Sequence, residues 1–434
     1  MSEESYSKGD TVDLLHELED ILESDPLIDE VGFIHPSQLL ALYEGSGIST
    51  SSSDKAMHQS GGRSFADTSN QENIYFWNRD HKLGISTHVL LPLYKAAKQE
   101  FMIAFKQFKT LGSQSDKVGD SSLVFESSYD CLEIILMRHS RSLLLLSCDF
   151  MTAWNCRKLV VLKKNQLSMF IDELHLSALV LSYSPKSEQA WNHRRWVIKS
   201  ISGNSSNFRE ILEKESELVE KLAERSKMNY RAWNHRCWLI SYMKREQVFR
   251  ELKKSRSWAA LHVADSSCFH YRRQLLLKIL EDSSCMEETV SSGYNVEIDQ
   301  VWKDELDWNK TMTKRYVGRE ALWLHRRFLS VCWSNNILRG SSDASYNSKE
   351  KISMKHCWDT FLEDEISLLS SCLTIVDDEF EDFHAQATYS ASYILWLKMQ
   401  VPEFLGIELQ EKLREFDLKA LLNKSYPQRS SLSV

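Results

Sequence analysis

The feature that most constrains this chain is a short motif that recurs five times between residues 150 and 330. Each copy has an aromatic residue followed three positions later by an arginine. The aromatic residues are Trp154, Trp191, Trp233, Phe269 and Trp323, at intervals of 37, 42, 36 and 54 residues. Internal periods of this size are typical of solenoids built from helical hairpins, so the repetition predicts that class of fold.

The composition agrees with a helical chain. There are only 14 glycines and 6 prolines in 434 residues, whereas β-rich and α/β chains use these residues freely in turns. The 13 tryptophans favour a well-filled core over disorder. An apolar stretch with helical spacing precedes each motif, so each unit is predicted to be helix A, a short turn, and a helix B that begins at the motif. The predicted fold class is all-α, a solenoid of α-α hairpins.

Changes in pattern along the chain predict its domain organisation. The predicted segments are 1–44 as an acidic N-terminal helical segment, 45–74 as a Ser/Gly-rich flexible linker, 75–124 as a helical lead-in with a polar break, 125–400 as the repeat solenoid, and 401–434 as a C-terminal cap and tail. A sixth, degraded hairpin is predicted within 356–399, and its lack of the motif suits a terminal repeat.

Charge and cysteine content exclude several functions. The net charge is −8, and residues 1–74 hold three Lys or Arg against fifteen Asp or Glu, so nucleic acid is not an expected partner. The nine cysteines lack metal-site spacing and are expected to be reduced thiols, with no metal site in this chain. Neither a signal peptide nor a transmembrane run is evident, so a cytoplasmic location is expected.

The repeated residues are interpreted as structural, because a packing unit, unlike a chemical group, has reason to recur in every hairpin. The aromatic residue is expected to fill the groove between helices A and B, and the arginine one turn later to stack on it or donate to free carbonyls at the end of a neighbouring helix. The histidines are expected to form hydrogen bonds across the hairpin. These residues are Trp154, Arg157, Trp191, His193, Arg194, Trp233, His235, Arg236, Phe269, Arg272, Trp323, His325 and Arg326.

A candidate functional residue lies where the repetition is broken. Pro185 is the only proline of the repeat region, and Lys186 follows it in the turn before helix B of the second unit. A cation beside a helix N-terminus does not stabilise the helix itself. It could instead bind an anion together with the free N–H groups of that end. The simpler interpretation is a solvated turn lysine.

The second unit reads Pro-Lys-Ser-Glu-Gln-Ala-Trp-Asn-His-Arg-Arg over 185–195, and the third keeps Asn-Tyr-x-x-Trp-x-His-Arg over 229–236. These segments resemble the Pro-Lys-Asn-Tyr-x-x-Trp-x-His-Arg-Arg repeats of protein prenyltransferase α subunits. The resemblance covers about residues 125–335. It implies a right-handed superhelical solenoid that wraps a β subunit, and the β subunit would carry zinc and the isoprenoid pocket.

The resemblance also implies a function. It is that of the α subunit of a heterodimeric protein geranylgeranyltransferase or farnesyltransferase, which is inactive without its β subunit. The β subunit shared with Rab geranylgeranyltransferase is a candidate partner, and the substrates would be proteins with a C-terminal cysteine. The alternative is a non-catalytic helical-repeat scaffold that binds a prenyltransferase-like β subunit or another protein. A tetratricopeptide adaptor is a third interpretation, but the motif register does not match that repeat.

The family motif assigns roles to individual residues. Lys186 matches the family lysine that approaches the isoprenyl diphosphate at the subunit interface, where it would neutralise charge on the departing diphosphate. Tyr230 retains the family tyrosine in the third unit, and Asn229 and Arg231 are further candidates for the diphosphate region. Glu188 replaces the family tyrosine in the second unit, and this replacement favours the scaffold alternative.

Overall fold

The computed structural model describes residues 8–44, 75–115, 123–203, 207–284, 293–339, 348–373, 379–401, 403–414, 416 and 418. The chain divides into two compact units, Met1–His235 and Arg236–Val434. The linker predicted at 45–74 lies outside the described residues, as does 116–122, most of the polar break predicted before the repeats.

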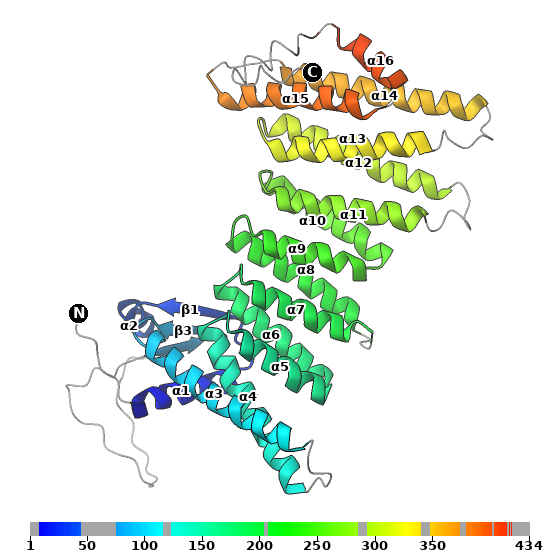
Figure 1. Ribbon diagram of the computed structural model, residues 1–434. Coiled ribbons are helices and arrows are strands. Elements are labelled where there is room, and N and C mark those ends of the chain that lie inside the picture. The colour runs from blue at the N-terminus through cyan, green and yellow to red at the C-terminus, as the bar shows by residue number, and fades with distance from the viewer. Residues whose placement is uncertain are drawn as a thin grey trace, which may run out of the picture. The chain divides into compact units, whose positions relative to one another are not determined.

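The repeats of the first unit are antiparallel helix pairs (Figure 1). They pair α4 (Leu123–Leu146) with α5 (Met151–Lys164), α6 (Leu167–Tyr183) with α7 (Glu188–Ile201), and α8 (Phe208–Arg225) with α9 (Tyr230–Leu239). Helix α9 begins in the first unit and ends in the second. Each of the three motifs in this part lies in the second helix of its pair, as the sequence predicts.

The second unit continues with the same element, and the predicted sixth hairpin is present as its last pair. After a 3₁₀ turn η1 (Ile240–Tyr242), the pairs are α10 (Arg245–Leu261) with α11 (Ser266–Ser284), α12 (Gly293–Arg315) with α13 (Glu320–Arg339), and α14 (Ser348–Leu373) with α15 (Glu381–Gln400), followed by α16 (Glu403–Lys412). The prediction of an all-α hairpin-repeat fold is confirmed for the repeat region.

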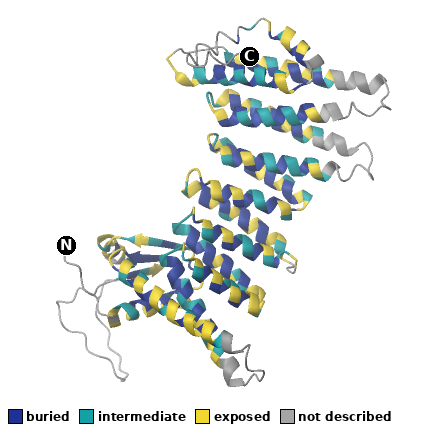
Figure 2. Ribbon diagram, viewed as in Figure 1, coloured by how far each residue is buried: buried dark blue, intermediate teal, exposed yellow. Residues whose placement is uncertain are grey.

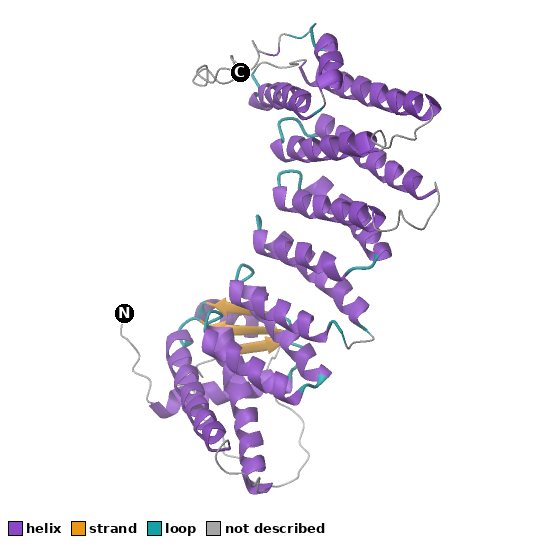
Figure 3. Ribbon diagram, turned by 45° about the vertical axis from the view of Figure 1, so that its right-hand side comes forward, coloured by secondary structure: helices purple, strands orange, loops and turns teal. Residues whose placement is uncertain are grey.

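The N-terminal part is not purely helical, which corrects the helical segments predicted there. Besides α1 (Lys8–Ser24), α2 (Pro36–Glu44) and α3 (Leu90–Ser115), it contains a three-stranded sheet of order β1-β3-β2, seen as orange arrows in Figure 3. The strands are β1 (Glu30–Ile34), β2 (Phe76–Arg79) and β3 (Lys82–Ser86). β1 pairs with β3 in parallel, and β2 pairs with β3 antiparallel.

Two features explain why the sequence does not predict this sheet. The partner of β1 lies some 50 residues away along the chain, so no local signal marks the pairing. The β2–β3 hairpin turns through Asp80 and His81, both with positive φ, where Asn-Gly would be the usual signal.

The sheet belongs to the first unit because it packs against two repeat helices. The N–H of Val31 donates to Ser182 Oγ of α6 at 3.0 Å, and Phe33 meets the ring of Tyr183 edge-on. Arg225 at the end of α8 forms an ion pair with Glu30 at 2.9 Å. The N-terminal segment is thus anchored to the C-terminal ends of α6 and α8.

The core of each unit is formed by the paired helices, which carry many buried residues, drawn dark blue in Figure 2. Trp154, Trp191 and Trp233 are among the largest buried side chains. The indole N–H of Trp154 donates to the carbonyl of Cys148 at 2.8 Å, and that of Trp191 to the carbonyl of Pro185 at 3.1 Å. Each of these two indoles therefore fills its hairpin and also ties down the turn that precedes its helix.

Candidate functional site

The motif arginines form buried ion pairs between consecutive hairpins. Each donates to a glutamate on helix A of the next hairpin, in the pairs Arg157–Glu173, Arg194–Glu215, Arg236–Glu251, Arg272–Glu305 and Arg326–Glu365. The third nitrogen of four of them donates to a carbonyl inside helix A of its own hairpin, at Met137, Leu174, Leu252 and Leu306. The expectation of helix-end carbonyls is therefore corrected: the acceptors are carboxylates and carbonyls in helix interiors.

The same glutamates accept a second hydrogen bond from helix B of their own hairpin. The pairs are His193–Glu173, His235–Glu215, Tyr271–Glu251, His325–Glu305 and Tyr393–Glu365, at 2.6–3.0 Å. Tyr271 and Tyr393 take the place of the histidine in the fourth and sixth hairpins. Each carboxylate thus joins an arginine of one hairpin to a histidine or tyrosine of the next.

The electrostatics of these clusters keep their charges fixed. Burial alone would raise the pKa of Glu173, but the charge of Arg157 and the hydrogen bond from His193 lower it to about 2. Glu215 behaves alike, with a pKa lowered to about 2. Burial lowers the pKa of His193, so its imidazole is neutral and donates through Nε2. Glu173 stays ionised and His193 stays neutral near pH 7, so this cluster suits a structural connection and not proton transfer.

The sequence analysis missed these glutamates, although a signal was present. In four hairpins the glutamate lies 20 residues before its histidine or tyrosine, within the apolar stretch of helix A. A carboxylate recurring at a fixed offset inside an apolar helix would have identified the partner of the motif arginine.

The four candidate site residues come together where two helices B begin. The turn 184–187 precedes α7, and the turn 226–229 precedes α9. The Nδ2 of Asn229 donates to the carbonyl of Pro185 at 3.0 Å. The Nζ of Lys186 lies 3.4 Å from the carbonyl of Lys227. Neighbouring hairpins therefore present their turns, and the N-termini of two helices, on one exposed edge of the first unit.

Asn229 has a positioning role at this edge. It is fully buried, and its Oδ1 accepts from the N–H of Ala232 at 3.2 Å, which caps α9. Its amide nitrogen holds the preceding turn. Both ends of the side chain are therefore occupied by the protein, and Asn229 is not free to contact a ligand.

The other three candidates are exposed. Tyr230 is 64% exposed. Arg231 forms an ion pair with Glu188 at 2.7 Å, so the glutamate that replaces the family tyrosine neutralises the neighbouring cation. No carboxylate of a described residue pairs with Lys186. Of the four candidate residues, Lys186 is therefore the cation that remains available to an anion.

In the part of the chain that the structure describes, no helix is long and apolar enough to cross a membrane. The same residues contain no group of three or more His, Cys, Asp or Glu side chains that could hold a metal ion.

Comparisons with known proteins identify the same repeats that the structure shows as helical hairpins. The family described as Protein prenyltransferase alpha subunit repeat matches residues 170–201, 212–243 and 248–279, which cover most of the pairs α6–α7, α8–α9 and α10–α11. Three segments of the chain between residues 170 and 279 are therefore similar to protein prenyltransferase alpha subunit repeats, which confirms the resemblance seen in the sequence there.

Individual relatives extend this similarity. The chain is 31% identical over 229 residues to Protein prenyltransferase alpha subunit repeat-containing protein 1 of Homo sapiens, covering 43% of this chain and 56% of the relative. It is 29% identical over 248 residues to protein 1-A of that name from Xenopus laevis, covering 48% and 57%. For the Danio rerio protein the identity is 31% over 229 residues, covering 44% and 53%. The chain thus spans little more than half the length of the curated relatives it matches.

Proposed function

We propose that this chain is the α-type subunit of a heterodimeric protein prenyltransferase. The complex would transfer a geranylgeranyl group from geranylgeranyl diphosphate to a C-terminal cysteine of a protein substrate. The β subunit would supply the zinc and the isoprenoid pocket. The observation that carries this proposal is Lys186, which is exposed, free of any carboxylate partner among the described residues, and in register with the family lysine.

The edge around Lys186 suits a diphosphate. Negative charge grows on a departing diphosphate as its C–O bond breaks, and a fixed cation stabilises that charge. The N-termini of α7 and α9 add partial positive charge at the same edge. The hydroxyl of Tyr230 is exposed beside them and can donate a hydrogen bond. Asn229 supports the fold of the two turns and would not itself contact the diphosphate, and Arg231 would act only after release from Glu188.

The charge of the helices B also supports a partner that carries an anion. Helices α5 and α9 contain no Asp or Glu, and α7 contains only Glu188 at its first position. A diphosphate held by a partner subunit would therefore meet little repulsion along this side of the hairpins.

The ion pair between Arg231 and Glu188 favours the second candidate function. A helical-repeat scaffold could bind a prenyltransferase-like β subunit, or another protein, without contributing a group to the reaction. A chain that no longer has to bind a diphosphate could tolerate a carboxylate here, and Glu188 neutralises the cation Arg231 close to Lys186.

Reconstitution tests the two functions. The chain is co-expressed with candidate β subunits, including the one shared with Rab geranylgeranyltransferase, and the purified complexes are assayed with geranylgeranyl and farnesyl diphosphates. Lys186→Ala is compared with Lys199→Ala, which removes an exposed lysine from the other end of α7. We expect Lys186→Ala to lower kcat by about 10²–10³-fold, with Lys199→Ala close to wild type.

Two results would decide against the enzyme. If none of the β subunits co-purifies with the chain, the subunit proposal is wrong. If a complex forms and Lys186→Ala turns over as fast as Lys199→Ala, the chain acts as a scaffold and the lysine has no part in the reaction.

A further inference from the structure

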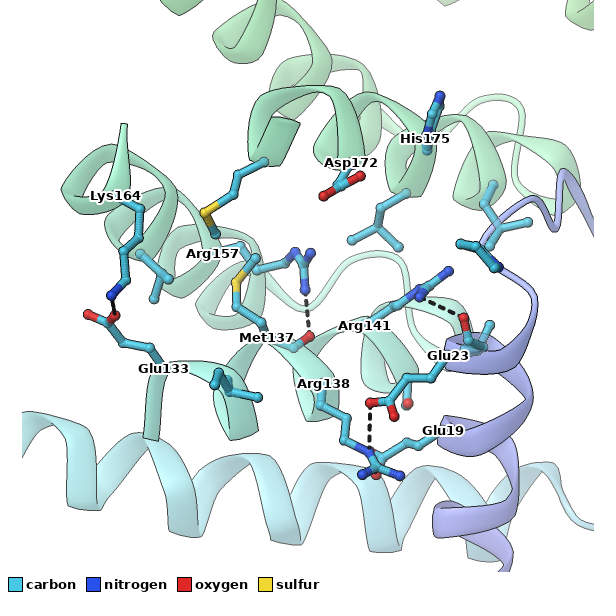
Figure 4. Close-up of a pocket in the computed structure, with 18 of the residues that line it drawn as sticks. Glu19, Glu23, Glu133, Met137, Arg138, Arg141, Arg157, Lys164, Asp172 and His175 are labelled. Carbon is cyan, nitrogen blue, oxygen red and sulfur yellow. Dashed lines mark hydrogen bonds and ion pairs between the residues drawn. The ribbon is translucent and has the colours of Figure 1, made fainter. Parts of the chain in front are cut away.

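A second region of the first unit has the properties of a ligand site. A cavity of about 640 Å³ lies among α1, α4, α5 and α6 (Figure 4). This volume is within the range of small-molecule sites. Every residue that lines it lies between Glu19 and Leu179, so the cavity is separate from the edge that carries Lys186. Its apolar lining includes Leu22, Ile28, Met137, Val160, Met169 and Leu176.

Most cations of this cavity are already neutralised. Arg138 forms ion pairs with Glu19 at 3.0 Å and Glu23 at 3.3 Å. Lys164 pairs with Asp130 at 2.7 Å and Glu133 at 3.0 Å. Arg157 is held by the buried carboxylate of Glu173, as described above. These ion pairs leave none of those three cations for a ligand.

Arg141 differs from the other three cations. It is half-buried, and its Nη1 donates to the carbonyl of Leu22 at 2.9 Å, but no carboxylate of a described residue pairs with it. Burial lowers the pKa of Arg141, and the charge of Arg157 lowers it further. The nearby charges of Asp172, Glu23 and Glu173 oppose this lowering without cancelling it. A partly buried guanidinium with no carboxylate bound directly to it is costly, and an anion bound against it would relieve that cost.

A second unsatisfied group lies next to this arginine. The Oγ of Ser142 is buried, lines the cavity, and has no hydrogen-bond partner among the described residues. Buried hydroxyls nearly always have a partner, so an orphaned one indicates a missing acceptor or donor. The remaining acid of the lining, Asp172 on α6, is exposed, where water and salt screen its charge.

We infer that this cavity binds an amphipathic anion. A carboxylate or phosphate group lies against Arg141 and Ser142, and the apolar body of the ligand lies along Met137, Met169 and Leu176. The proposed prenyltransferase role uses none of these residues, so the two proposals succeed or fail independently.

Calorimetric titration of the full chain tests this site with octyl phosphate, octanoate, inorganic phosphate and 1-octanol at constant ionic strength. We expect octyl phosphate or octanoate to bind at least tenfold more tightly than inorganic phosphate or 1-octanol. The ratio of octyl phosphate to octanoate affinity identifies the head group, and either preference supports the proposal.

Three variants separate recognition from folding. Arg141→Met keeps the apolar stem and removes the charge, so we expect at least a tenfold loss of affinity for the anionic probes and no change for 1-octanol. Arg141→Lys keeps the charge and should bind more tightly than Arg141→Met. Lys199→Met, outside the cavity, should bind as wild type does. The proposal is wrong if 1-octanol binds as tightly as both anionic probes, or if folded Arg141→Met retains wild-type affinity.

Discussion

Arg194 on α7 and Glu215 on α8 form a two-bond ion pair in the buried seam between the second and third hairpins. Nε of the arginine lies 2.6 Å from Oε2, and Nη2 lies 2.5 Å from Oε1. His235 on α9 donates to the same carboxylate at 3.0 Å. Each carboxylate of this kind connects two hairpins, so the stack depends on charge pairing as well as on apolar packing.

Breaking this pair should destabilise the first unit strongly. Glu215→Gln leaves the buried guanidinium of Arg194 without a counter-charge, which typically costs about 3–5 kcal/mol of the free energy of unfolding. Adding Arg194→Met to that variant removes the uncompensated charge and should recover part of the loss. Urea unfolding, with hydrogen exchange in α6 to α9, measures the effect. If the two single losses simply add in the double variant, the pair is not coupled as the geometry requires.

Acid should weaken the protein in two stages. Burial lowers the pKa of His193 below its ordinary value of 6.5, so the unfolded chain takes up a proton there before the folded chain does. Stability therefore falls as the pH drops below 6.5, by up to about 1.4 kcal/mol per pH unit for each such histidine. Glu173 has its pKa lowered from 4.5 to about 2, so its contribution is complete above pH 4.5 and is lost between 4.5 and 2.

Denaturant midpoints at pH 8, 6, 5 and 4 measure this acid dependence. His193→Gln supplies the matched control, because glutamine can donate a hydrogen bond but does not titrate. The variant should show a shallower decline between pH 6.5 and 5 than wild type. Equal slopes for the two proteins would contradict a buried neutral histidine.

The tyrosines that replace histidine should be exchangeable with it. The hydroxyl of Tyr271 donates to Glu251 at 2.6 Å, and the guanidinium of Arg236 lies 4.7 Å from the centre of its ring. Tyr271→Phe removes the donor and should cost about 1–3 kcal/mol of unfolding free energy. Tyr271→His restores a donor of the kind used by the other hairpins and should cost less. A histidine variant less stable than the phenylalanine variant, by thermal unfolding, would show that the two side chains are not equivalent here.

Substitutions of Asn229 should lower the free energy of unfolding without lowering the activity of the folded protein. Asn229→Ala removes the cap of α9 and the bond to Pro185, for a loss of about 1–2 kcal/mol. Asn229→Asp keeps the capping oxygen but loses the amide donor, so its loss should be smaller. In a reconstituted complex, activity should follow the folded fraction in both variants. A loss of activity in fully folded Asn229→Asp would indicate instead that the two turns must be held together for the reaction.

Local rules predict the repeat region well because its pattern is local. The aromatic and arginine of each motif lie on one face of one helix, and the helical period alone places them there. The N-terminal sheet is different, because β1 pairs with a strand some 50 residues later and the hairpin turn lacks glycine. No short-range signal could indicate that register.

The candidate site divides in the same way. The family motif selected Lys186, Asn229, Tyr230 and Arg231 from the sequence, but their chemical availability depends on neighbours from another hairpin. The amide of Asn229 donates to the carbonyl of Pro185, 44 residues earlier, and Arg231 pairs with Glu188, 43 residues earlier. No sequence pattern singles out Arg141. Its lack of a carboxylate partner follows from the tertiary structure, in which nearby carboxylates such as Glu19 pair with other cations.

By itself, the sequence determined the hairpin period, the motif positions and the helical class, because these follow from the 3.6-residue repeat and from the scarcity of turn-breaking residues. Only the tertiary structure decided which charges are paired and which are free. The partner of a motif arginine lies 15 to 39 residues away on the next hairpin, and desolvation in that seam strengthens each ion pair. Lys186 and Arg141 are two cations that this pairing leaves without a carboxylate partner among the described residues.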